Sequence, residues 1–169
     1  MLEITKFAFK YDPAADRLRI AVIGKDGRCT LLLTRRLAIR WLKALAQWLE
    51  SGADPALGLE IAHGRALSRL ARAAGASPGE PEGKAAGEPV LVSSIKSVQS
   101  RQSINIAFYA GNDEAAAEGA FGRVAGHGLL DRLARAMDRA GWSDPVPIPE
   151  WCRSASLEKQ PMRGKATLH

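Results

Sequence analysis

Residues 17–49 read RLRIAVIGKDGRCTLLLTRRLAIRWLKALAQWL, and the spacing of the apolar residues changes once along this stretch. Up to residue 33 apolar side chains alternate with other residues, which is the pattern of half-buried strands. Asp26-Gly27 is typical of the tight turn that joins two strands into a hairpin. From residue 35 to about residue 49 apolar residues recur every three to four positions, as on one face of a helix. The stretch therefore predicts a hairpin followed by an amphipathic helix, with Thr34 as its N-cap and Ser51-Gly52 at its end.

Residues 2–11 predict one more strand before this hairpin. The apolar residues change parity between Ile4 and Phe7, and a bulge near Thr5-Lys6 would bring both sets to one face. A turn at 12–16 then leads into the strand at Leu18. The first 33 residues therefore predict a three-stranded meander.

The second half of the chain predicts the same order of elements. Strands are expected over 89–99 and 104–109, with a loop at 111–119 and a weak third strand marked by Phe121 and Val124. An amphipathic helix is expected over 129–140, and an extra helix near 55–74. The predicted fold class is α+β, with two β-β-β-α units whose antiparallel sheets are covered by amphipathic helices.

The two units also match in sequence, which predicts an internal pseudo-repeat. Strand residues such as Leu18 and Ile104 lie 86 positions apart, whereas helix residues such as Trp41 and Met137 lie 96 apart. The alternative interpretation is that these matches arose by chance, because the chain is rich in Ala, Arg and Leu and short matches are therefore common. In a true repeat the two half-sheets would pair into one sheet or pack as a pseudo-dimer.

Composition divides the chain further. Residues 1–75 form the first unit with the extra helix, and 76–88 are a Gly- and Pro-rich linker or loop. Residues 89–153 form the second unit with an extended Pro-rich tail, and 154–169 are expected to be a disordered tail.

The chain has 169 residues, a net charge of +6 and two cysteines without a CxxC spacing. These values exclude a collagen-like or disulfide-rich scaffold. The first residues lack the apolar core of a signal peptide, and no apolar run is long enough to cross a membrane. We therefore expect a cytoplasmic protein with no membrane association.

Motifs for catalysis, metal binding or phosphate binding are absent from the sequence. His63, His127 and His169 are isolated, and His127 is interpreted as a loop residue before a helix. Cys29 and Cys152 have no partner at zinc spacing. Asp131 and Asp138 are expected to pair with arginines on their own helix. We therefore expect no enzyme, no metal and no cofactor.

Basic residues are the strongest functional signal. Five lie in the predicted strands of the first meander, with Tyr11 beside them, and others form stripes on the two helices. Such a surface can hold single-stranded nucleic acid through phosphates and stacked bases. The candidate contacts are Lys6, Lys10, Tyr11, Arg17, Arg19, Arg28, Arg36, Arg40, Lys43, Arg132, Arg135 and Arg139.

Two binding functions follow from these observations. The first is a protein-interaction or accessory module whose contact is the Trp142–Trp151 segment or an edge strand. Its partner would be another protein or, in a homodimer, a second copy of the chain. The second is single-stranded nucleic-acid binding. A repeated sheet-then-helix unit is similar in outline to the Whirly-type single-strand-binding folds, which place four strands before each helix where three are predicted here. The likeness is one of topology, without a shared sequence motif.

Overall fold

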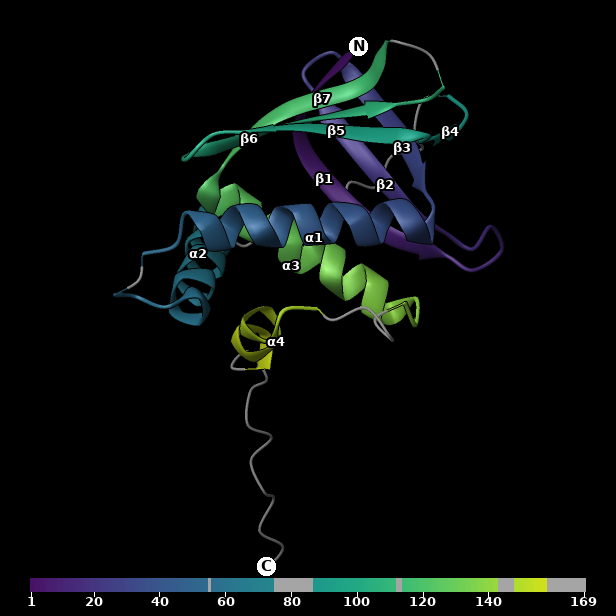
Figure 1. The fold of residues 1–169 in the computed structure, drawn as a ribbon. Helices are drawn as coiled ribbons and strands as arrows, with labels where there is room; N and C mark the ends of the chain where they lie inside the picture. Colours follow the sequence, from purple (N-terminus) through teal and green to yellow (C-terminus); the bar gives the residue numbers. More distant parts are fainter. Residues whose placement is uncertain (55, 75–86, 112–113, 143–147, 158–169) are drawn as a thin grey trace, which may run out of the picture.

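The computed structural model describes residues 1–54, 56–74, 87–111, 114–142 and 148–157, with side chains through 153. The described residues form one seven-stranded sheet with four helices on one side of it (Figure 1). The elements are β1 (Leu2–Asp12), β2 (Arg17–Gly24), β3 (Gly27–Leu33), α1 (Arg35–Ser51), α2 (Leu59–Ala73), β4 (Val90–Leu91), β5 (Ser94–Gln99), β6 (Ser103–Tyr109), β7 (Ala115–Gly122), α3 (Arg123–Arg139) and α4 (Glu150–Leu157). The α+β class is therefore confirmed.

The first meander and its helix form as the sequence predicts. β1 pairs antiparallel with β2, and the register shifts between Ile4 and Lys6, where the parity of the apolar residues changes. The Thr34 hydroxyl accepts a hydrogen bond from the Leu37 N–H at 3.3 Å, which caps α1. Gly52 follows the last residue of α1 as its C-cap. Local sequence signals thus account for this part of the fold.

The second half corrects several predicted boundaries. The strand expected over 89–99 is two strands, β4 and β5, and the loop expected at 111–119 contains the start of β7. α3 begins at Arg123, so Val124 and His127 lie in the helix. β7 is rich in Ala and Gly and shows no clear alternation, so its strand character depends on β6 and β1, which pair with its two edges.

The prediction of antiparallel pairing throughout is wrong at two places. The strand order is β4-β3-β2-β1-β7-β6-β5, and both the β1–β7 and β3–β4 pairs are parallel. Pairing within each meander is set by short turns, which make neighbouring strands antiparallel. The pairing between meanders is instead set by the long crossover through α1 and α2, and parallel strands need such a connection.

β4 and β5 lie at opposite ends of the strand order, although only Val92 and Ser93 separate them in sequence. The Val92 N–H donates to the Leu32 carbonyl of β3 at 3.0 Å, and the Ser93 N–H donates to the Tyr109 carbonyl of β6 at 2.8 Å. The two edges of the sheet therefore approach each other here. The sheet curls around the core, and its outer face is convex.

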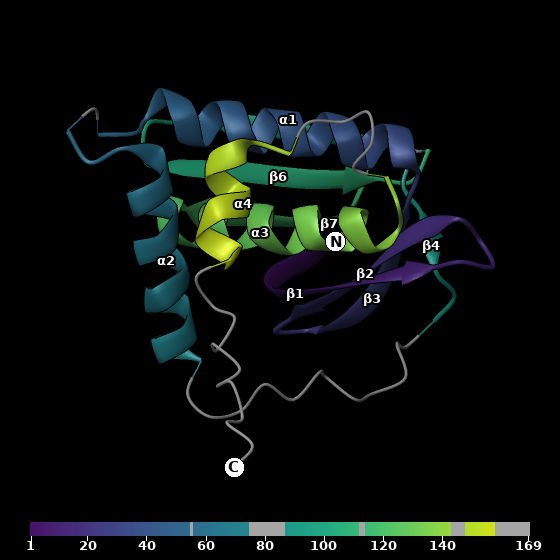
Figure 2. The same cartoon turned by 90° about the horizontal axis from the view of Figure 1, so that it is seen from below.

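One hydrophobic core spans both meanders and both long helices. Trp41 of α1 packs edge-on against Phe108 of β6, with ring centroids 5.2 Å apart and planes at 89°. Phe7 of β1 contacts both rings, and Met137 of α3 is fully buried in the same cluster. α2 packs against α3 and α4, outside the layer formed by α1 and α3 (Figure 2).

The remaining predicted segments are described only in part. α2 falls within the expected helix near 55–74. Most of the predicted linker at 76–88 and of the Pro-rich stretch lies outside the described residues. α4 runs across the predicted boundary at 154, and residues 158–169 lie outside the described part.

The two long helices begin at a smaller sequence offset than the 96 positions of the predicted triplet match. Arg35 and Arg123, the first residues of α1 and α3, lie 88 positions apart, close to the 86 of the strands, whereas the triplet match placed the helices 96 apart. Because Arg, Leu and Ala recur with the helical period, a short match can slip by about two turns.

Candidate functional site

Five basic residues of the first meander share the outer face of the sheet. Residues that pair directly across antiparallel strands point to the same side, and the registers place Lys6 beside Ile23 and Ile23 beside Arg28. Lys10 lies beside Arg19 in the same way. The four described helices lie on the opposite face (Figure 1). We call this surface the basic face: Lys6, Lys10, Arg17, Arg19 and Arg28.

Small residues separate two rows of charge on the basic face. Ala8 pairs with Ala21, and Ala21 pairs with Thr30 on its other side; these residues lie midway between the row of Lys6 and Arg28 and the row of Lys10 and Arg19. The rows are four strand residues apart, or roughly 13 Å. Lys6, Lys10 and Arg28 are exposed. The basic face therefore presents two rows of positive charge on either side of a strip of small side chains.

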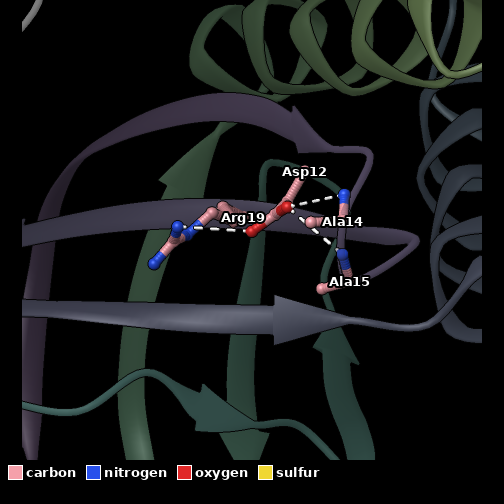
Figure 3. A network of polar contacts seen from close by, with 4 residues as sticks. All are labelled: Asp12, Ala14, Ala15 and Arg19. Carbon is pink, nitrogen blue, oxygen red and sulfur yellow. Dashed lines mark hydrogen bonds and ion pairs between the residues drawn. The ribbon is translucent and has the colours of Figure 1, made fainter.

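Asp12 is an acidic residue at the end of this surface (Figure 3). One of its carboxylate oxygens lies 3.3 Å from an Arg19 guanidinium nitrogen, and the other accepts from the backbone N–H groups of Ala14 and Ala15. Asp12 therefore holds the β1–β2 turn and positions Arg19.

The positive charge does not continue across the sheet. Glu3 of β1 is in register with Glu118 of β7, and both lie on the outer face where the meanders join. Farther on, the Lys96 ammonium lies 4.4 Å from the centroid of the Tyr109 ring. The basic face is therefore confined to β1, β2 and β3.

Tyr11 is not part of the basic face. It pairs with Leu18, a core residue, and its ring packs edge-on against Trp142 at 5.6 Å. Its hydroxyl donates to Asp16 at 2.9 Å, and this hydrogen bond raises the pKa of Tyr11. The parity of β1 after the bulge places Tyr11 opposite to Lys6 and Lys10, so it cannot stack bases beside them.

The basic helix residues lie elsewhere on the molecule. Arg36, Arg40 and Lys43 are exposed on α1, away from the sheet. On α3, Arg132 donates to the Phe7 carbonyl at 3.0 Å, and Arg135 pairs with Asp131 at 3.0 Å, as expected for that acid. Arg139 is exposed at the end of α3. The structure thus divides the predicted contacts between two sides of the protein.

The two tryptophans expected to contact a partner pack within the chain. Trp142 is 3% exposed and belongs to the core. Trp151 is half-buried, and its indole N–H donates to the Glu50 carboxylate at 3.1 Å. Much of the apolar area of both side chains is thus used in folding.

A buried polar cluster lies where α2, α3 and α4 meet. The Nδ1 atoms of His63 and His127 are 3.0 Å apart, so one ring donates to the other. Ligand atoms of His63, Asp131 and Cys152 lie within 4.8 Å of one another. We call His63, His127, Asp131 and Cys152 the polar cluster; all four are buried.

Burial dominates the electrostatics of the polar cluster. It lowers the pKa of His127 to about 4, with help from the nearby His63 and Arg123. Burial also raises the pKa of the Cys152 thiol to about 12, and the charge of Asp131 adds to the shift. At neutral pH His127 is therefore a neutral imidazole and Cys152 a thiol.

The polar cluster was missed because its members are far apart in sequence. His127 and Asp131 are four residues apart and share a face of α3, which is a visible signal. His63 and Cys152 come from other helices, and only their packing brings them to that face.

Comparisons with known proteins assign no relative to this chain. No protein-family model matches it, and no curated protein or solved structure is significantly similar. Within the described residues, no helix is both long and apolar enough to cross a membrane.

Proposed function

We propose that this protein binds single-stranded nucleic acid through the basic face. The observation that carries the proposal is that five basic side chains of β1, β2 and β3 share the one face of the sheet that no described helix covers. The net charge of +6 gives the whole chain the sign that attracts a polyanion. Phosphate contacts of this kind supply affinity without reading sequence.

The curvature of the sheet favours a single strand over a duplex. A duplex is stiff over about 150 base pairs, so it touches a convex surface over a short length unless it is bent at a cost. A single strand is flexible and can follow the twist from one row of charge to the other. Since Tyr11 is turned to the core, phosphate contacts rather than stacking would provide most of the affinity.

A matched pair of variants tests the proposal. Lys10→Glu with Arg28→Glu reverses two charges on the basic face, and Arg36→Glu with Arg40→Glu makes the same net change on α1. Binding of a fluorescent single-stranded oligonucleotide is titrated at several salt concentrations. We expect the first variant to bind much more weakly and with a smaller salt slope, at about 0.7 per lost phosphate contact. The second should retain the slope of the unmodified chain.

Two results would contradict the proposal. One is the absence of measurable binding by the unmodified chain at low salt, where the attraction is strongest. The other is an equal loss of affinity in both variants, which would indicate net charge alone. A loss of affinity confined to the α1 variant would place the site at Arg36 and Arg40 of α1 instead.

A second candidate function is protein interaction through the edge strand β5. Among the described strands β6 is its only neighbour, and Val98 on β5 is 71% exposed. An open edge can pair with a strand of a second copy of the chain. Analytical ultracentrifugation should then show a dimer that Val98→Glu dissociates, and a monomer at all concentrations would exclude this contact.

We also propose that the two meanders with their helices are structurally equivalent units. The support is the shared element order, the 17-residue length of both α1 and α3, and the similar offsets of 86 and 88. Ile20 and Ile106 would then be equivalent core positions. Substituting either by Ala should cost a similar free energy of unfolding, about 2–5 kcal/mol. Costs that differ by more than about 2 kcal/mol would count against equivalence.

A further inference from the structure

The polar cluster has the composition and geometry of a metal site. We propose that His63, Asp131 and Cys152 bind one Zn²⁺ ion at the junction of α2, α3 and α4, and that His127 orients the His63 ring through the hydrogen bond between them. The donors are an imidazole nitrogen, a carboxylate oxygen and a thiolate sulfur, all of which are common zinc ligands.

The distances place three donors around one point. The ligand atoms of His63, Asp131 and Cys152 are all within 4.8 Å of one another. Zinc binds nitrogen and oxygen at about 2.0–2.2 Å and sulfur at about 2.3 Å, so donors in a tetrahedral site are about 3.3–3.8 Å apart. Small side-chain rotations would therefore close the site. A fourth position would remain for water or another ligand.

His127 and Arg135 are positioned to orient the ligands. Nδ1 of His63 would carry the proton and donate to Nδ1 of His127, 3.0 Å away, which leaves Nε2 of His63 unprotonated as the ligand. Arg135 donates from Nε to one oxygen of Asp131 at 3.0 Å, and this hydrogen bond fixes the orientation of the carboxylate. Metal ligands in proteins are usually held by such hydrogen bonds, which fix the tautomer and the orientation of the donor.

Burial and charge also fit an ion. The Trp151 ring packs edge-on against His63 and His127, at 5.2 and 6.1 Å between centroids, and covers the cluster. A Zn²⁺ ion would balance the charges of the Cys152 thiolate and the Asp131 carboxylate, and the partly exposed Arg135 would add one positive charge beside Asp131. The metal would also supply the positive charge that deprotonation of Cys152 requires.

Glycines in α3 permit the helices to approach at this point. A Cβ at Gly128 would overlap the Leu70 side chain of α2, and Leu70 lies seven residues after His63. Residues seven apart lie on nearly the same face of a helix, so the close approach at Gly128 brings His63 against α3. The glycine at position 128 is thereby explained by packing against α2.

Cobalt binding to the full chain without an affinity tag tests the proposal. Co²⁺ replaces Zn²⁺ and reports a thiolate ligand by a near-ultraviolet charge-transfer band. We expect one Co²⁺ per chain with this band, displaced by Zn²⁺. Cys152→Ser should abolish the band and weaken binding at least 100-fold, whereas the matched variant Cys29→Ser should change neither. His127→Ala should weaken binding about 10- to 100-fold with the band retained.

Several outcomes would overturn the proposal. One is a wild-type chain that binds no stoichiometric Co²⁺ or Zn²⁺ at micromolar concentration, and this result needs no variant to fold. Another is a charge-transfer band that survives in Cys152→Ser or disappears in Cys29→Ser. Circular dichroism of each variant verifies its fold, and Asp131→Asn, which keeps the shape of the side chain, provides an independent loss of affinity.

Discussion

Gly126 of α3 lies directly against the ring of Trp48 in α1, so closely that a Cβ at this position would overlap the ring. Trp48 is buried and held in place, because its indole N–H donates to the Ser100 carbonyl at 2.8 Å. The glycine therefore sets the distance between the two long helices that cover the sheet.

Gly126→Ala should destabilise the protein, although alanine is the better helix former. The methyl group would overpack a site where the ring cannot move, at a cost of about 1–3 kcal/mol. Gly64→Ala in α2 is the matched control, because a Cβ there meets nothing within 4 Å. This change should stabilise the protein by up to about 1 kcal/mol. Urea denaturation measures both effects, and equal shifts of the two variants would contradict the packing argument.

Arg123 should stabilise the end of α1. One guanidinium nitrogen donates to the carbonyls of Trp48 and Leu49, which lie in the last turn of α1 and lack helical partners. Arg123→Met should reduce the free energy of unfolding by about 2–3 kcal/mol, since hydrogen bonds from a charged group are lost. Arg123→Lys should restore only part, because a lysine has no planar fork. If the melting temperature of Arg123→Met lies within 1 °C of that of the wild type, this role is excluded.

Trp41 should tolerate phenylalanine far better than alanine. Its ring fills the core between Phe7 and Phe108, and Trp41→Ala should cost about 3–5 kcal/mol. Within the described residues its buried indole N–H has no hydrogen-bond partner. Trp41→Phe removes this polar group while keeping most of the ring, so its cost should be less than half as large. Denaturation in urea measures both; a phenylalanine variant as unstable as the alanine variant would contradict the prediction.

The metal-free protein should lose stability as the pH falls from about 6.5 to about 4. His127 in the folded chain has a pKa of about 4, whereas in the unfolded chain it has its ordinary pKa near 6.5. Between these values the unfolded state binds more protons, so acid favours unfolding, by on the order of 3 kcal/mol in all. His127→Gln should flatten this part of the profile. The test is the free energy of unfolding measured against pH with a chelator present. If His127→Gln shows the same slope between pH 6.5 and 4 as the wild type, the prediction is refuted.

Sequence reasoning found the elements whose causes are local. The bulge near Thr5, the Thr34 cap and the end of α1 at Gly52 each depend on a few neighbouring residues. It marked only the end of β7, at Phe121, and placed the start of this strand in a loop, because a strand of Ala and Gly is recognisable only from the strands that pair with its edges. It also placed Tyr11 near the basic residues, although the alternation of the strand turns the ring to the core.

The sequence by itself determined where apolar and basic side chains alternate, and hence that Lys6, Lys10, Arg19 and Arg28 share one face. The period of a strand or helix dictates which residues point together, whatever surrounds them. Only the tertiary structure decided which face the helices leave open, that β1 and β7 run parallel, and that His63 meets Asp131 and Cys152. Such contacts join residues far apart in the chain, and their formation depends on how closely whole helices pack, here through the glycines at 126 and 128.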